Sequence, residues 1–280
     1  MDEELQKQLM VRFEEAVVLG YGDDPRRALE LLEILLQEIQ ENEYRGLIML
    51  YEAFFLARDE RTTEARAKLK EVAKIWERTP EHEARMAVMD ALFDEADGQA
   101  SRTLKKLNRI LKQYPALWKS DDTSDLYEEL QFNRGRLLAT IGDRRLALPV
   151  LEECLSFQRP KHPELFANLG ICYFEAKEWE KAVENLELAL SKGLSTTYSS
   201  AAHYYLGRVS YLKGALPKAV KEFELALDDA TEAGTSRKVI YDALAKSCQH
   251  LGLSEESVKY ARLAKNSSEV EVGHPADPSF

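Results

Sequence analysis

Residues 165–190 read LFANLGICYFEAKEWEKAVENLELAL. On each side of the central EAKEW segment, apolar residues recur at intervals of three and four, which is the spacing of one face of an amphipathic helix. Gly170 stands inside the first of these two helical patterns. Glycine in a helix interior costs about 1 kcal/mol relative to alanine, so we expect a packing reason for its presence.

The pattern around Gly170 recurs along the chain. Twelve residues after this glycine comes Ala182, followed by Leu186 and Ala189, which gives the order small, small, large, small. Three more copies begin at Gly135, Gly207 and Ala245 and have their second small residue at Ala147, Ala219 and Ser257. Successive second positions are 35, 37 and 38 residues apart, so the chain contains an internal repeat.

Each copy predicts two amphipathic helices joined by a tight turn, at 141–145, 175–179, 212–216 and 251–255. Two antiparallel helices approach closely only where the side chains at their crossing are small. We therefore expect Gly170 in the first helix to face Ala182 in the second helix. A bulky side chain at Ala182 would overpack this crossing by roughly 1–3 kcal/mol.

The register resembles that of the tetratricopeptide repeat family, whose consensus has an aromatic residue, Leu-Gly and Tyr in its first helix. The repeat at 163–196 matches it with Phe166, Leu169, Gly170, Tyr173, Ala182, Leu186 and Ala189. The resemblance implies an all-α fold, a right-handed α-solenoid or superhelix of about seven antiparallel helix pairs. It is specific across 126–267 and weaker before, where Ala16, Ala28 and Leu32, and then Ala53 and Ala65, give the best register.

Departures from the repeat predict the domain organisation. Residues 1–114 are expected to form degenerate helical hairpins, and 126–267 the regular repeats. Between them, 115–125 lengthens the local period and is expected to be a linker or hinge. Residues 268–280 lack a helical period and are expected to form a flexible tail. Pro149 should kink or restart the second helix in which it falls.

Charge and composition narrow the class of partner. The chain has 49 acidic against 38 basic residues, a formal charge of −11, which disfavours nucleic acid. The first residues, MDEELQKQL, lack the pattern of a secretory signal. No stretch approaches the roughly 18 apolar residues of a membrane span. We therefore expect a cytoplasmic protein that does not bind a membrane.

The sequence predicts neither catalysis nor a cofactor or metal site. No HExxH, CxxC, GxSxG or phosphate-binding glycine loop occurs. His203 is expected to pack between helices, and His250 to lie on the surface. The three cysteines are widely spaced and are expected to pack as small apolar residues, at Cys154, Cys172 and Cys248.

In the tetratricopeptide repeat family, the first helix of each repeat lines a concave groove that contacts partners. The register places in this groove Phe132, Asn133, Arg136, Asn168, Tyr204, Tyr205, Arg208, Lys246 and Gln249. Arg136, Arg208 and Lys246 occupy one slot, and such a ladder of cations suits a peptide that carries carboxylates. The alternative is that these residues reach solvent or pair with neighbouring glutamates.

A more specific mode of binding is disfavoured. Members of the family that bind chaperone tails use a five-residue carboxylate clamp of Lys, Asn, Asn, Lys and Arg. The corresponding positions here are Phe132, Arg136, Asn168, Ala201 and Tyr205. Only the asparagine agrees.

These patterns together predict a non-enzymatic scaffold or adaptor that binds a protein or peptide through the groove. An alternative function is a regulatory sensor whose solenoid changes curvature when it binds a short peptide. The acidic opening helix and the Lys/Glu-rich final helix resemble polar caps, which favours a monomer. Self-association remains the alternative, because the ends of solenoids can expose apolar faces.

Overall fold

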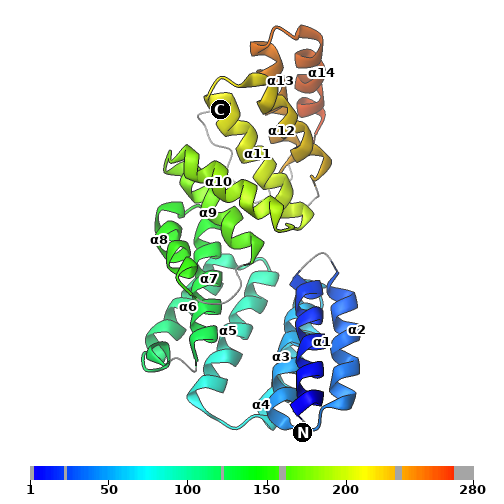
Figure 1. The fold of residues 1–280 in the computed structure, drawn as a ribbon, viewed down its shortest axis with the longest axis vertical. Helices are drawn as coiled ribbons and strands as arrows, with labels where there is room; N and C mark the ends of the chain where they lie inside the picture. The colour runs from blue at the N-terminus through cyan, green and yellow to red at the C-terminus, as the bar shows by residue number, and fades with distance from the viewer. Residues whose placement is uncertain (1–2, 22–23, 121–122, 158–161, 231–234, 268–280) are drawn as a thin grey trace. The chain divides into compact units, whose positions relative to one another are not determined.

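The computed structural model describes the chain except residues 1–2, 22–23, 121–122, 158–161, 231–234 and 268–280. The described residues form fourteen α-helices and one 3-10 helix, and contain no β-strand (Figure 1). The predicted all-α fold of seven helix pairs is therefore confirmed. The tail predicted at 268–280 lies outside the described residues.

The chain divides into two compact units, residues 1–130 and 131–280. The first unit contains α1 (Glu3–Tyr21), α2 (Pro25–Glu38), α3 (Asn42–Arg58), α4 (Thr62–Ile75), α5 (Pro80–Ala96), α6 (Ala100–Gln113) and the 3-10 helix Leu117–Lys119. Helix α7 (Ser124–Thr140) begins in the first unit and ends in the second. The second unit continues with α8 (Arg144–Leu155), α9 (Pro163–Glu175), α10 (Trp179–Ser191), α11 (Thr196–Leu212), α12 (Leu216–Asp228), α13 (Arg237–His250) and α14 (Ser254–Asn266). The linker or hinge predicted at 115–125 stays a prediction.

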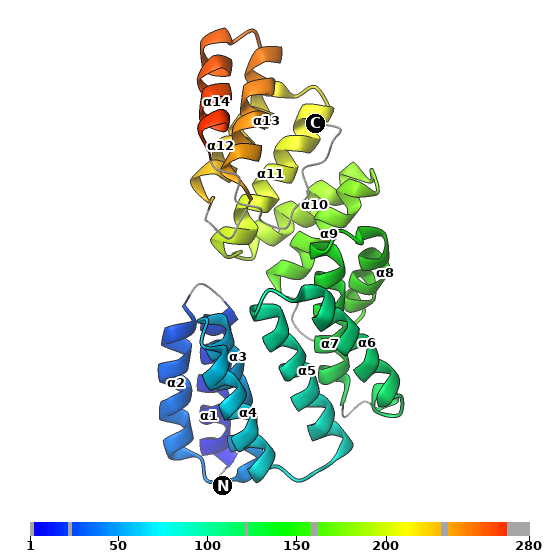
Figure 2. The ribbon, with the colours of Figure 1, turned by 180° about the vertical axis from the view of Figure 1, so that it is seen from behind.

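Consecutive helices pack as hairpins, and the hairpins stack within each unit. In the second unit, α9 packs on α10, α11 on α12 and α13 on α14, as Figure 2 also shows from behind. The second helix of one hairpin then contacts the first helix of the next, as α10 does with α11. The first helices also contact one another, α9 with α11 and α11 with α13. Each hairpin thereby covers the apolar side of its neighbour.

The glycines of the repeat make room for a large side chain on the partner helix. A Cβ atom added at Gly170 would lie 2.6 Å from Cγ of Leu186 and 3.1 Å from the carbonyl oxygen of Ala182. The same relationship joins Gly207 to Phe223, at 2.6 Å from Cδ1. The expected approach of Gly170 to Ala182 is confirmed, because the Ala182 backbone lies close to the glycine. The side chain that packs on the glycine, however, is that of Leu186.

The last repeat closes its crossing differently. It has Ala245 where the others have glycine, and Ser257 where they have alanine. The Ser257 hydroxyl donates a hydrogen bond of 3.0 Å to the Ala245 carbonyl oxygen. This hydrogen bond thus links the two small residues directly, and with them α13 and α14.

The hairpin turns share one backbone conformation. The residue with positive φ is Gly142 (94°), Gly214 (73°) or Gly252 (76°) in three repeats, but Lys177 (63°) in the repeat of α9 and α10. In the hairpins α9–α10, α11–α12 and α13–α14, the amide of the next residue donates to the carbonyl oxygen five residues before it, as when Ala215 N–H donates to Ser210 O at 2.9 Å. Glycine adopts this left-handed conformation without steric cost, whereas lysine does not.

The N-terminal hairpins keep the register that their sequence predicts. Ala16, Ala28 and Leu32 are fully buried between α1, α2 and α3, and Ala53 and Ala65 are fully buried in the next pair. The small residues that the weaker consensus of this half predicts at its crossings therefore lie in the core.

Two further predictions concern single segments. Helix α8 continues through Pro149, so the predicted restart is wrong. Pro149 is exposed, and water can therefore bond the carbonyl group that the proline leaves without an N–H partner. In the segment 115–125, the Trp118 indole donates to Leu111 O at 2.8 Å, and Thr123 Oγ1 donates to Leu117 O. Its role as a hinge stays a prediction.

Candidate functional site

The predicted site residues lie on the first helices of the second unit, but they differ in exposure. Gln249 is exposed, and Phe132, Arg136 and Lys246 are partly buried. The others are less than a tenth exposed: Asn133, Asn168, Tyr204, Tyr205 and Arg208. Arg136, Arg208 and Lys246 thus occupy the same position of the repeat, but Arg208 is buried and the other two are only partly buried.

Arg208 is at the centre of a cation–aromatic cluster between α9 and α11. Its guanidinium carbon lies 4.6 Å from the ring centroid of Phe174 and 5.9 and 6.0 Å from those of Tyr204 and Tyr205. Phe174 and Tyr205 meet edge to face at 5.1 Å. Desolvated contacts of a guanidinium with an aromatic face contribute up to about 2 kcal/mol each, so this cluster fixes α9 against α11.

A second arginine joins the cluster from the start of α8. The Arg144 guanidinium carbon lies 5.9 Å from the Tyr205 ring, and Nη1 donates to a Glu175 carboxylate oxygen at 2.7 Å. The Arg144 side chain is 10% exposed. Its Nε and Nη2 atoms are buried and have no hydrogen-bond acceptor among the described residues. Two guanidiniums therefore lie close to the Tyr205 ring, and Glu175 pairs with the one from Arg144.

Sequence reasoning missed three members of this cluster: Arg144, Phe174 and Glu175. Arg144 and Glu175 lie in segments interpreted only as hairpin turns. Phe174 belongs to an apolar run whose periodicity indicates burial but not a cationic partner. The run of buried residues 165–174 in α9, longer than one helical face, is the signal that could have identified it.

Burial keeps the nearby titratable groups neutral. It raises the pKa of the Cys172 thiol to about 12, with Arg144 acting in the opposite direction and Glu175 in the same one. Burial likewise raises the pKa of Tyr205. At neutral pH this thiol is therefore protonated and weakly nucleophilic.

Two of the predicted groove residues form hydrogen bonds within their own helices. Arg136 Nη2 donates to Asn133 Oδ1 at 3.1 Å within α7. Asn168 Nδ2 donates to Glu164 O at 2.8 Å within α9. Such bonds hold these side chains against their own helices.

The other residues singled out in the sequence have structural surroundings. His203 Nδ1 lies 2.8 Å from a Glu222 carboxylate oxygen across the α11–α12 hairpin, which confirms packing between helices. His250 is exposed, as predicted, and stacks on Tyr211 at 5.5 Å. All three cysteines are buried, as expected for small apolar residues of the core. In the part of the chain that the structure describes, no cluster of three His, Cys, Asp or Glu side chains could hold a metal ion.

The described helices also include none with the length and apolar content needed to cross a bilayer. In the cluster, aromatic rings and Glu175 hold two largely buried guanidiniums in place.

Comparison with known proteins identifies the repeat. A family model described as Tetratricopeptide repeat matches residues 132–197. The BBSome complex member BBS4 of Bos taurus is 30% identical over 123 residues, which cover 42% of this chain and 23% of that protein. The chain thus matches less than a quarter of the length of this curated relative.

Two solved structures resemble the fold over nearly the whole chain. The apo form of the quorum sensor NprR from B. thuringiensis has a TM-score of 0.66 at 15% identity, over 95% of this chain and 78% of that one. The APC/C hetero-tetramer Cut9-Hcn1 also has a TM-score of 0.66, at 14% identity, over 92% and 46%. At these identities the likeness concerns the fold alone. The family match shows that residues 132–197 consist of tetratricopeptide repeats.

Proposed function

We propose that the chain is a non-enzymatic scaffold that binds a protein or peptide partner along the first helices of its second unit. The observation that carries this proposal is the Arg208 cluster, which locks α9 to α11 and α8 through aromatic and ionic contacts. A surface held in this way is preformed, so the ordering cost of binding falls mostly on the partner.

The burial of Arg208 assigns it a supporting role in this proposal. With 4% of its surface exposed, Arg208 orients Tyr204 and Tyr205. The more accessible cations of the same slot, Arg136 on α7 and Lys246 on α13, then contact the partner. Gln249 extends this surface along α13. A peptide with carboxylates spaced along it has the complementary chemistry.

The experiment is affinity capture from a cell lysate with matched charge reversals. Arg136→Glu with Lys246→Glu changes the two cations of the first helices. Arg145→Glu with Lys259→Glu makes the same change in charge on exposed positions of α8 and α14. We expect the first pair to lose the captured partners and the second pair to keep them, with both variants as helical as the parent chain. Equal capture by the first pair and the parent chain would reject the proposed surface.

A second candidate function is a regulatory sensor that changes curvature on binding a short peptide. The observation that favours it is the likeness, over 95% of this chain, to a structure described as a quorum sensor. Small-angle scattering of the full chain with and without a captured peptide distinguishes the two. A changed scattering profile favours the sensor, and identical profiles favour the rigid scaffold.

A further inference from the structure

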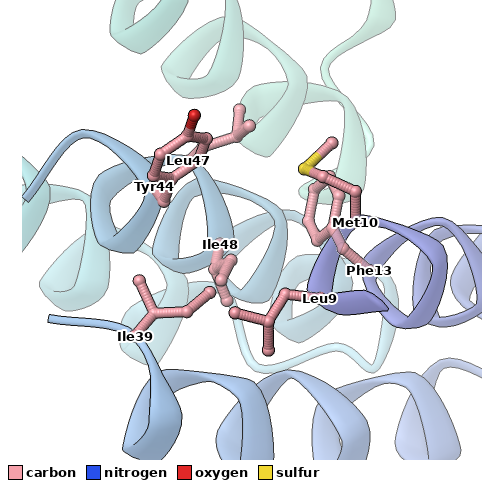
Figure 3. Close-up of a pocket in the computed structure, with 7 residues that line it drawn as sticks. All are labelled: Leu9, Met10, Phe13, Ile39, Tyr44, Leu47 and Ile48. Carbon is pink, nitrogen blue, oxygen red and sulfur yellow. The ribbon is translucent and has the colours of Figure 1, made fainter. Parts of the chain in front are cut away.

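The first unit contains an apolar pocket formed by three helices. Figure 3 shows side chains of α1 and α3 converging on it, with one residue at the end of α2. Its empty volume of about 300 Å³ includes solvent at the opening. The lining residues are Leu9, Met10, Phe13, Ile39, Tyr44, Leu47 and Ile48.

The lining changes from buried to exposed across the pocket. Leu9 and Ile48 are each 3% exposed and belong to the core of the unit. Met10 is 36% exposed, and Tyr44 and Leu47 are partly buried. The pocket therefore opens to solvent beside Met10, where an apolar side chain from outside can enter.

Two cations near the pocket, Arg12 and Arg45, are already engaged. Arg12 forms a bidentate pair with Glu38, at 2.7 and 2.9 Å. Arg45 Nη1 donates to the carbonyl oxygens of Leu36 and Ile39, at 2.6 and 2.7 Å, and so caps the end of α2. Neither arginine offers a compensating charge to an incoming carboxylate.

Exposed carboxylates flank the same opening. Glu14 follows Phe13 and lies one helical turn beyond Met10, and Glu41 lies in the short connection between Ile39 and Tyr44. The whole unit is acidic: residues 1–130 have 29 acidic and 19 basic residues, a formal charge of −10. Residues 131–280 have 20 and 19, a formal charge of −1. Nearly all the excess negative charge of the protein is therefore in the unit that contains the pocket.

We propose that this pocket is a docking site for a basic amphipathic segment of a partner protein. One large apolar side chain of the segment enters between α1 and α3, and its flanking Lys or Arg side chains face Glu14 and Glu41. Burial of such an anchor contributes about 1.5–3 kcal/mol, and the acidic surface speeds the encounter. This surface is separate from the proposed site in residues 131–280 and does not depend on it.

The test uses fluorescence anisotropy with the full chain and a synthetic peptide as the probe. The peptide is an amphipathic helix with Leu and Phe on one face and Lys on the other. A control peptide has Glu in place of every Lys. We expect the Lys peptide to bind, with weaker binding at higher salt, and the Glu peptide not to bind. Equal binding of both peptides would overturn the proposal.

Matched variants locate the site on α1. Met10→Asp changes the pocket wall, whereas Val11→Asp changes an adjacent residue that does not line it and is 59% exposed. Glu14→Lys changes the flank, whereas Glu15→Lys makes the same charge change on the opposite side of the helix. We expect about tenfold or greater weakening with Met10→Asp and weakening of a few fold with Glu14→Lys. If Val11→Asp and Glu15→Lys weakened binding as much as Met10→Asp and Glu14→Lys, the binding would depend only on the net charge of the protein. That result would overturn the proposed site.

A second copy of the chain is the competing occupant. Sedimentation velocity over a range of protein concentrations distinguishes docking of a partner segment from self-association. A monomer at every concentration supports the proposal. A dimer that Met10→Asp dissociates and Val11→Asp leaves intact would assign the pocket to self-association instead.

Discussion

Leu186 on α10 lies over Gly170 on α9, so closely that a Cβ atom at residue 170 would be 2.6 Å from Leu186 Cγ. Leu186 is fully buried, as is Ala182 one turn before it. Glycine is therefore needed at residue 170 because a side chain of the partner helix fills the space, and not because the backbone there has an unusual conformation. The same arrangement at Gly207 and Phe223 makes it a property of the repeat.

This contact predicts a change of sign in a double-mutant cycle. Gly170→Ala should lower the free energy of unfolding, because overpacking of roughly 1–3 kcal/mol exceeds the helix-propensity gain of about 1 kcal/mol. In a Leu186→Ala background the clash with the leucine is removed and the 3.1 Å approach to the Ala182 carbonyl oxygen stays. The same substitution should then be neutral or stabilise by up to about 1 kcal/mol. Urea unfolding of the four proteins measures both effects. Stabilisation by Gly170→Ala in the parent chain would show that the crossing is loose.

The turn between α9 and α10 predicts that replacing Lys177 by glycine stabilises the protein. Lys177 has φ of 63°, where the other turns of the second unit have glycine. Lys177→Gly should raise stability by up to about 1 kcal/mol, because it removes the steric cost of the left-handed conformation. Lys181→Gly, inside α10, should instead lower stability by about 1 kcal/mol. Thermal unfolding compares the two variants. If both raised or both lowered the melting temperature, this explanation would be contradicted.

The Arg208 cluster predicts that lysine cannot replace this arginine. Arg208→Lys keeps the charge but loses the planar contact with Phe174, and should cost about 1–2 kcal/mol. Arg145→Lys, at an exposed position of α8, should stay within about 0.5 kcal/mol of the parent chain. Denaturant midpoints decide the comparison. Equal, negligible effects would mean that the aromatic contacts contribute nothing to stability.

A buried carboxylate predicts acid sensitivity in the first unit. Burial alone would raise the pKa of Asp94, but hydrogen bonds and charges from Lys106 and Arg66 outweigh it and hold the pKa below its usual value. Its stabilising contribution is therefore present above the unfolded pKa of about 3.9 and is lost as the pH falls through the folded pKa. Asp94→Asn should cost about 2–4 kcal/mol at neutral pH and should flatten the acid limb of a plot of stability against pH.

Glu52 provides the matched control for this pH experiment. Burial raises its pKa, and Lys68, at 3.1 Å, only partly offsets the effect. Ionised Glu52 therefore costs stability at neutral pH, and the cost is relieved as the pH falls through its raised pKa. Glu52→Gln should act in the opposite direction to Asp94→Asn at neutral pH. Destabilisation by both would mean that Lys68 compensates fully for the burial.

The sequence predicted the parts of the fold that depend on local spacing. The interval between Gly170 and Ala182 indicated a hairpin crossing, and the structure has that crossing. The side chain over Gly170 was not predicted, because helical spacing identifies neighbours on one helix and not the residue that meets them from another. Lys177 was not distinguished from other turn residues, since nothing in its side chain indicates a left-handed backbone.

The candidate site was predicted only in part, for a related reason. The repeat register placed Tyr204, Tyr205 and Arg208 on one first helix, where the structure has them together. It did not indicate that Phe174, from α9, would lie against Arg208, or that Arg144, from α8, would lie against Tyr205. The pocket at Leu9 and Ile48 likewise depends on residues far apart in the sequence, which no periodicity connects.

Site-specific photo-crosslinking tests the proposed scaffold most directly. A photoreactive phenylalanine analogue at Gln249, on α13, should form covalent adducts with a partner in lysate, and Arg136→Glu with Lys246→Glu should abolish them. The same analogue at Lys259, exposed on α14, should form none. Adducts from residue 259 but not from residue 249 would contradict binding along the first helices.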